Sequence, residues 1–271
     1  MTRRTRSIFL FVALLSFAGV AAAHETWLLP ASMRIRAGET VALSLTSGMA
    51  FPADDFAIQP ARVTRAEARL GKRIEQLKKP KLQSMSLQYL WTPRGNGVGT
   101  IGIELGPRKL ELEPKLIEEY FQEIHASSVV RAQWDSIPSP KRWRESYVKH
   151  ASSFILVGPA GTDRSWSSPL GLGLEIIPET NPTTLSAGDT LKVRVMRRGL
   201  EIAGFAVGAR REGESSETFV NTDGDGRAAI PLPRQGRWLL FGTDLRPARE
   251  RGLEWRSDFV TTTIGVGSPS R

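Results

Sequence analysis

The stretch Thr184–Met196, with the sequence TLSAGDTLKVRVM, contains the pattern that decides the fold. Its residues Ala187-Gly188-Asp189 form a turn signal, and a strand follows directly over 190–196. An earlier stretch, Ser32–Thr40 (SMRIRAGET), leads in the same way into an alternating strand that starts at Val41. Two related β-sandwiches in succession explain this repetition, and so does a chance similarity of two ordinary hairpins.

The second half of the chain consists of short β-rich segments separated by turn residues. Such spacing is typical of a β-sandwich of immunoglobulin-like or prealbumin-like kind, which we expect over residues 174–271. The segment 159–173, rich in Gly, Ser and Pro, is the expected linker. The predicted strands are 174–177, 190–196, 203–210, 217–221, 228–232, 237–241 and 255–264.

The first half, residues 24–158, is expected to form another β domain with a helical insert over 113–150. Two β-rich runs, 82–91 and 98–105, flank the turn 92–97, and 153–157 is a further strand. Helical spacing begins after Glu113, where Pro114 suits a first helical turn. A second helix is expected over Pro140–His150, with Trp143 and Tyr147 on one face. The apolar residues at helical spacing in the first helix are Leu116, Ile117, Tyr120, Phe121 and Ile124.

The N-terminus has the features of a secretory signal peptide over residues 1–23. Three arginines precede an apolar run, 8–20, and Ala21-Ala22-Ala23 supplies the small residues of a cleavage site. The run is short for a membrane anchor, and no later stretch is apolar enough to cross a bilayer. We therefore expect a mature protein that does not span the membrane, located in a periplasm or outside the cell.

Composition excludes several classes of protein. The chain has no Cys, which excludes disulfides, thiolate metal sites and Cys nucleophiles. Its formal net charge of +9 includes three signal arginines, and the remaining basic residues are scattered among acids without aromatic interleaving. We expect no nucleic-acid partner.

His24 is the principal candidate for a metal ligand. Cleavage after Ala23 places its imidazole beside a free α-amine, and the two can chelate one metal ion. A second His would complete an arrangement that suits Cu(II) and, less well, Ni(II). A frayed end with an arbitrary residue is the alternative interpretation. The other histidines, His125 and His150, are the further candidates, although each also suits a helix end or a packing position. Carboxylates such as Glu25 or Asp244 offer oxygen ligands.

Two further kinds of motif bear on the function. The sequence Asn221–Gly226 (NTDGDG) matches the opening of an EF-hand loop, but Leu232 stands where the bidentate Glu belongs, so a Gly-rich hairpin turn is the better interpretation. No Gly-x-Ser-x-Gly, HExxH or phosphate-loop motif occurs. We predict that the protein is not an enzyme.

Several motifs together resemble a known family. They are Ala23-His24-Glu25-x-Trp27-Leu28-x-Pro30, the run from Gly171 to Leu191 that contains Pro178-Glu179-Thr-Asn-Pro182, and Thr222-Asp223-x-Asp225-Gly226 with Gly236-Arg237-Trp238. The chain resembles a domain-of-unknown-function family of secreted bacterial proteins, often described as similar to the NikM-type periplasmic component of nickel and cobalt uptake systems.

The resemblance implies export, a β-rich body and a role in transition-metal uptake or handling. The family's His after the signal falls on His24, whereas Asp244 stands in a segment where the family often has a His. We therefore expect an exported protein that binds a divalent transition metal (nickel, cobalt or copper) and has a membrane transporter as its partner. The alternative is a non-catalytic β-sandwich module for structure or protein interaction, with no metal.

Overall fold

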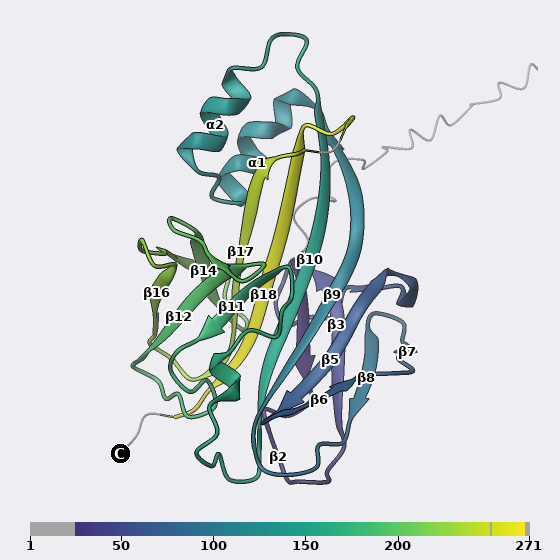
Figure 1. Ribbon diagram of the computed structural model, residues 1–271, viewed down its shortest axis with the longest axis vertical. Helices are drawn as coiled ribbons and strands as arrows, with labels where there is room; N and C mark the ends of the chain where they lie inside the picture. The colour runs from purple at the N-terminus through teal and green to yellow at the C-terminus, as the bar shows by residue number, and fades with distance from the viewer. Residues whose placement is uncertain (1–24, 250, 269–271) are drawn as a thin grey trace, which may run out of the picture.

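The computed structural model describes residues 25–249 and 251–268 (Figure 1). The fold is mainly β: two consecutive β-sandwiches with a short helical insert in the first, which confirms the predicted fold class. The predicted signal peptide and His24 lie outside the described residues. Within these residues, no helix is both long enough and apolar enough to cross a membrane.

The first sandwich is built mainly from the strands that precede residue 158. Turns with Gly or Pro separate most of them, as the sequence pattern predicts. The strands are β1 (Glu25–Pro30), β2 (Arg34–Ile35), β3 (Val41–Gly48), β4 (Phe56–Ala57), β5 (Val63–Leu70), β6 (Arg73–Gln76), β7 (Lys81–Leu82), β8 (Leu87–Trp91), β9 (Gly97–Leu112) and β10 (Trp143–Val157).

The second sandwich uses the strands that follow residue 173. They are β11 (Leu174–Pro178), β12 (Asp189–Arg197), β13 (Leu200–Glu201), β14 (Ala206–Arg211), β15 (Glu217–Asn221), β16 (Arg227–Leu232), β17 (Gly236–Pro247) and β18 (Trp255–Val266). Short 3₁₀ turns cover Pro60–Arg62, Pro114–Leu116 and Ser165–Ser167, and the α-helices are α1 (Ile117–Glu123) and α2 (Ser128–Asp135).

One central sheet belongs to both sandwiches. Its order is β15-β14-β17-β18-β10-β9-β5-β6, and the long strands β17, β18, β10 and β9 run side by side along the molecule (Figure 1). The first outer sheet is β1-β3-β8-β7 with β4 on β3, and the second is β11-β12-β13 with β16 on β12. The two halves of the chain therefore join through continuous β pairing.

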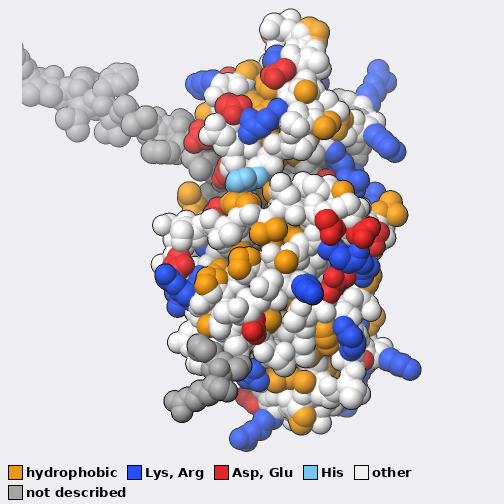
Figure 2. Space-filling view, turned by 90° about the vertical axis from the view of Figure 1, so that its left-hand side faces the viewer, with side chains coloured by type: hydrophobic (Ala, Val, Ile, Leu, Met, Phe, Trp, Pro, Cys, Tyr) orange, Lys and Arg blue, Asp and Glu red, His pale blue; other side chains and the backbone are white. Residues whose placement is uncertain are grey.

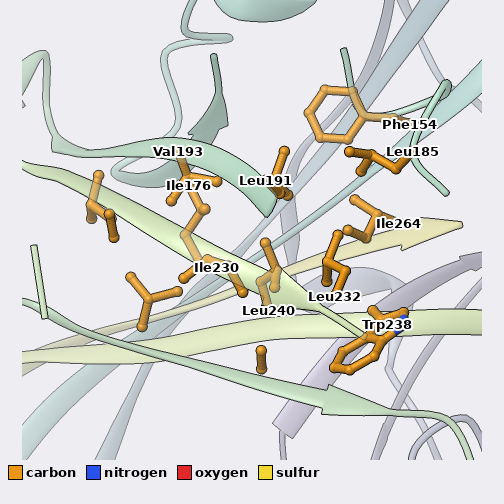
Figure 3. Close-up of a cluster of buried hydrophobic side chains, with 14 of the residues drawn as sticks. Phe154, Ile176, Leu185, Leu191, Val193, Ile230, Leu232, Trp238, Leu240 and Ile264 are labelled. Atoms are coloured by element: carbon orange, nitrogen blue, oxygen red, sulfur yellow. The ribbon is translucent and has the colours of Figure 1, made fainter. Parts of the chain in front are cut away.

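The outer sheets lie on opposite faces of the central sheet. Along β10, Ile155 and Val157 belong to the core against the first outer sheet, whereas Phe154 belongs to the core against the second. Since successive side chains of a strand point to opposite faces, β10 is buried on both sides, which explains its continuous apolar run. Figure 3 shows the second core, where Leu240 and Ile264 of the central sheet meet Leu191 and Ile230.

The two sandwiches are a structural repeat. The pairings of β1, β3 and β8 recur as β11, β12 and β16, and those of β5, β6, β9 and β10 recur as β14, β15, β17 and β18. The last strands of the two repeats, β10 and β18, pair in parallel from Glu145↔Trp255 to Ser153↔Thr263. This correspondence supports two related sandwiches over chance similarity of two hairpins.

The two turns that the sequence pattern singles out have the same hydrogen bonds. Asp189 Oδ2 accepts from the Ser186 amide at 2.8 Å, and Glu39 Oε2 accepts from the Arg36 amide at 3.0 Å. In each turn the glycine, Gly38 or Gly188, has a positive φ that favours a residue without Cβ. Each turn feeds the central strand of an outer sheet.

The helical insert packs against one end of the central sheet (Figure 1). Ser127 caps α2 by accepting from the Val130 amide at 3.3 Å. Tyr120 donates to the buried Glu145 carboxylate at 3.0 Å, and Trp143 donates to the same group at 2.8 Å. These bonds satisfy a carboxylate that burial would otherwise penalise.

The helix predicted over Pro140–His150 is wrong, because residues 143–157 form strand β10. The spacing of Trp143 and Tyr147 also fits a strand, and pairing with β9 on one side and β18 on the other decides the outcome. The second helix is instead α2, Ser128–Asp135.

The turn after Asn221 also differs from its prediction as a hairpin, because β15 and β16 belong to different sheets. Asp223 Oδ1 accepts from the amides of Asp225 and Arg227, at 2.9 and 2.8 Å. Its carboxylate therefore closes the turn that carries the chain from the central sheet to the second outer sheet.

The segment 159–173 is fixed to the first sandwich. The Arg69 guanidinium donates to the carbonyls of Ser165, Ser168 and Pro169 at 2.6 to 2.8 Å. Leu170 and Leu172 of the segment 159–173 are buried. This segment, the predicted linker between the two halves, is therefore packed against the rest of the protein.

Candidate functional site

A cavity of about 160 Å³ lies where β1 begins. Its floor comes from β10, β17 and β18 of the central sheet, and its rim comes from the ends of β3 and α1 and from β14 and β15. The ionisable side chains in its lining are Glu25, Glu123, Lys149, His150, Arg210 and Glu217, and the apolar ones include Met49, Ile124, Phe241 and Phe259. It combines an apolar wall with convergent charges, the usual composition of a binding site.

Glu25 is the least exposed acid of this cavity. It forms an ion pair with Arg210, which also donates to Glu217 at 2.7 Å. Burial raises the pKa of Glu25 to about 7, and the negative charge of Glu217 adds to this, whereas the Arg210 charge opposes it. At neutral pH the carboxyl group therefore exchanges readily between its protonated and ionised forms.

Lys149 places a buried ammonium group in the same cavity. Its Nζ lies 5.8 Å from the Tyr147 ring centre and 5.6 Å from that of Phe259. Burial lowers the pKa of Lys149 to about 8, with a further contribution from Arg62, whereas Glu25 opposes the shift. The cavity thus holds an acid and a base that both titrate near neutral pH.

The rim of the cavity is acidic. Desolvation raises the pKa of Glu123, and the nearby carboxylates of Glu119 and Glu217 raise it further. Mutual repulsion among such acids favours the uptake of a cation or a proton. Sequence patterns do not identify Glu123, Glu217 and Arg210, because they come from α1, β15 and β14 and meet only in the fold.

His24 lies outside the described residues, but it directly precedes Glu25 in the chain. The strand that follows is firmly held. The Thr26 carbonyl accepts from Thr261 Oγ1 at 2.6 Å, and Trp27 is completely buried.

His125 is exposed at the end of α1, with a left-handed φ of 50°. Its ring stacks on Phe219, with ring centres 3.5 Å apart, and Phe219 contacts Phe241 of the cavity wall. His125 does not belong to the cavity lining itself. Its stacking fits the packing interpretation that the sequence left open.

His150 is buried, and its side chain interacts with residues of β9 and β18. Its Nε2 lies 3.1 Å from Asp258 Oδ1, and its Nδ1 lies 3.2 Å from Glu104 Oε2. Burial alone lowers the pKa of His150, but hydrogen bonds and charges from Asp258 and Glu104 raise it overall. The two neighbouring carboxylates therefore favour the protonated form of the imidazole.

Asp244 is bound by two arginines. Its Oδ2 accepts from Arg197 and from Arg246, each at 2.6 Å, and Arg246 also pairs with Asp258. The fold thus joins Asp244 to His150 through Arg246 and Asp258. Within residues 25–249 and 251–268, no three His, Asp or Glu side chains form a group that could hold a metal ion.

A second pocket, of about 540 Å³, lies at the start of β11, the place in the second repeat that corresponds to the start of β1. There the residues that precede β11 are held by hydrogen bonds. Glu175 accepts from the amides of Leu170, Gly171 and Leu172 at 2.7 to 3.0 Å. The Gly173 amide donates to Glu104 at 3.0 Å.

Comparison with known proteins gives one family. Residues 21–241 match the model of a domain of unknown function, DUF4198. No curated protein matches the sequence.

Three of the similar solved structures are remote in sequence from this chain. The adhesin InvE of Yersinia pseudotuberculosis has 11% identity and a TM-score of 0.25, over 92% of this chain and 61% of the adhesin chain. Domains FN1–FN3 of chicken CNTN1 have 11% identity and a TM-score of 0.20, over 91% of this chain and 68% of theirs. An α-2-macroglobulin of Escherichia coli has 10% identity and a TM-score of 0.23, over 91% of this chain and 16% of its own.

Proposed function

The chain belongs to the DUF4198 family, and we propose that it is an exported protein that binds a divalent transition-metal ion at its processed N-terminus, beside the cavity at the start of β1. The observation that carries the proposal is the position of Glu25. It lines the cavity, is ion-paired with Arg210, and directly follows His24 in the sequence.

The anchoring of β1 supports a preorganised site. Consecutive Cα atoms are about 3.8 Å apart, so the residue attached to Glu25 stays close to the cavity mouth. The Thr261 bond to the Thr26 carbonyl and the burial of Trp27 fix the strand from which it extends. Metal-binding groups on a fixed backbone lose less conformational entropy when the ion binds than the same groups on a frayed chain end.

The donor groups suit a small, borderline-soft cation. Cleavage after Ala23 would supply an α-amine and an imidazole at His24, which favour Cu(II) and Ni(II). The carboxylates of Glu25, Glu123 and Glu217 would add negative charge around them. Arg210 and Lys149 oppose the accumulation of further positive charge, which limits the site to one ion.

The start of β11 in the second repeat can be compared with the start of β1 in the first repeat. Ahead of β11, Leu170 and Leu172 are buried, and Glu175 binds their amides. In the first repeat, cleavage after Ala23 would leave only His24 ahead of Glu25. The processed chain would then leave its cavity accessible to an ion.

The cellular role that we propose is nickel, cobalt or copper uptake or handling. Its basis is the likeness of the motifs around His24 and Gly171–Leu191 to proteins described as similar to the NikM-type periplasmic component. In that role the protein would deliver its ion to a membrane transporter. Protonation of the imidazole and the amine should release the ion in acid.

Calorimetric titration of Ni(II) and Cu(II) into protein purified from the periplasm tests the proposal. The native N-terminus should bind one ion, and His24→Ala should lose this binding. His125→Ala is the matched control and should bind as the wild type does. A form with one additional N-terminal Met should bind more weakly, because the amine no longer belongs to His24.

Two results would contradict the proposal. One is binding no tighter than that of a short peptide containing one His. The other is unchanged binding by His24→Ala. Either would favour the protein-interaction module, for which the sandwiches serve as a non-catalytic scaffold.

A further inference from the structure

A cleft lined by five arginines lies between the β12–β13 turn and the ends of β17 and β18. Its volume is about 540 Å³. The lining consists of Arg197, Arg198, Arg246, Arg249 and Arg256, together with Pro247 and Ala248. Within the described residues, no acidic side chain lines it. Glu250, which follows Arg249 in the chain, lies outside these residues.

Two of these arginines, Arg197 and Arg246, are positioned by carboxylates that do not line the cleft. Asp244 Oδ2 binds Arg197 and Arg246 together, and Asp258 binds Arg246 on its other side. Asp258 has only 4% of its side chain exposed, and Asp244 has 11%. Asp244 and Asp258 together balance the charges of Arg197 and Arg246, two of the five guanidinium groups in the lining. Arg198, whose side chain is exposed, adds a further positive charge to the cleft.

Arg198 is held at the tip of the turn in an unusual conformation. Its φ is 48°, and Gly199 after it has a φ of 81°. This left-handed pair suits a two-residue hairpin turn, in which Asn or Gly is the usual first residue. An arginine there costs conformational free energy, and such outliers are a reason to consider a functional role. The Arg198 side chain is exposed and lines the cleft.

This charge is local. On the face in Figure 2, acidic and basic side chains are interspersed, and the formal excess of +9 is spread over 271 residues. Five arginines in one cleft are therefore a concentration of charge that composition does not explain. A planar guanidinium group can donate two parallel hydrogen bonds to two oxygens of a phosphate or a carboxylate. Arginine is therefore a preferred side chain for binding such anions.

We propose that this cleft is a binding site for an anionic phosphate group. Arg198 and Arg256 are shared with the neighbouring pocket, so a ligand larger than a single phosphate can extend toward Gly173 and Glu175. The phosphate can come from a soluble compound or from a lipid headgroup. The proposal does not depend on the metal site, which lies at the start of β1.

Calorimetric titration with inorganic phosphate and pyrophosphate, at low and at physiological salt, tests the site in the full-length mature protein. Sedimentation with phosphatidylglycerol vesicles, compared with phosphatidylcholine vesicles, tests the lipid source. We expect one site that binds pyrophosphate more tightly than phosphate, with affinity that falls as salt increases. Binding to phosphatidylglycerol vesicles without binding to either soluble anion would assign the phosphate to a lipid.

Arg198→Gln should weaken binding about tenfold, because it removes charge-assisted hydrogen bonds from an exposed position without disturbing the core. The matched control is Arg73→Gln, which removes the same charge from the exposed strand β6 and should leave binding within about twofold. An equal loss in both variants would show a diffuse field and overturn the proposal. Absence of binding to phosphate, pyrophosphate and phosphatidylglycerol vesicles would also overturn it.

Discussion

His150 Nε2 and Asp258 Oδ1 lie 3.1 Å apart and join the last strands of the two repeats, β10 and β18. Both side chains are buried, and Glu104 and Arg246 complete the interaction on either side. The pair therefore links the two sandwiches by charge at the place where they already share a sheet.

The stabilisation from this pair should depend on pH in two directions. The pKa of His150 is raised by folding, so its contribution is complete below an unfolded value of about 6.5 and is lost as pH rises through the folded value. The pKa of Asp258 is lowered from 3.8 to about 2, so its contribution is present above 3.8 and is lost as pH falls toward 2. Denaturant unfolding should show the largest difference between wild type and His150→Gln at about pH 4 to 6.5.

Asp258→Asn should lower the free energy of unfolding by about 3 kcal/mol, because it removes the buried carboxylate that Arg246 and His150 share. Glu254→Gln removes a more exposed carboxylate from its pair with Arg144 and should cost less than about 1 kcal/mol. Urea titration of both variants at pH 6 measures the difference. Equal effects would show that the buried pair contributes no more than a surface one.

Gly99→Ala should destabilise the first sandwich by about 2 kcal/mol. A Cβ at this position would lie 2.3 Å from the rigid, buried ring of Trp91. Gly224→Ala is the control, because a Cβ there meets no atom within 4 Å. Thermal melting should separate the two variants, and a Gly99→Ala protein as stable as wild type would mean that Trp91 moves without cost.

Tyr120→Phe should reduce stability by about 1 kcal/mol, because it removes one hydrogen bond to the buried Glu145 carboxylate. The loss of stability should be largest in the helical insert, which the Tyr120 hydrogen bond connects to β10. Hydrogen exchange should therefore accelerate in α1 and α2 more than in β12. Uniform acceleration would indicate that the insert and the sandwiches unfold together.

Lys149→Met should raise the pKa of Glu25 above about 7, because the Lys149 charge opposes protonation of that carboxyl group. Lys72→Met removes an exposed lysine and should leave the Glu25 titration unchanged. Carbon-13 NMR of the glutamate side chains against pH measures both. An unchanged Glu25 titration in Lys149→Met would show that the two charges are screened from each other.

Local patterns were sufficient where a structural element depends on its own residues. The turns at Gly38 and Gly188 form as predicted because glycine and the following acid satisfy the backbone locally. The first helix after Pro114 forms because its apolar spacing and first-turn proline agree. The sandwich class followed from short strands separated by such turns.

Tertiary pairing decided the remainder. Residues 143–150 have spacing that suits either a helix or a strand, and only β9 and β18 on either side select the strand. The same pairing carries His150 into a buried ionic network with Asp244, which a search for metal ligands by residue type could not anticipate. The cavity at Glu25 likewise exists only because seven strands and a helix end converge there. Charges that are distant in sequence interact strongly only when the fold removes water between them.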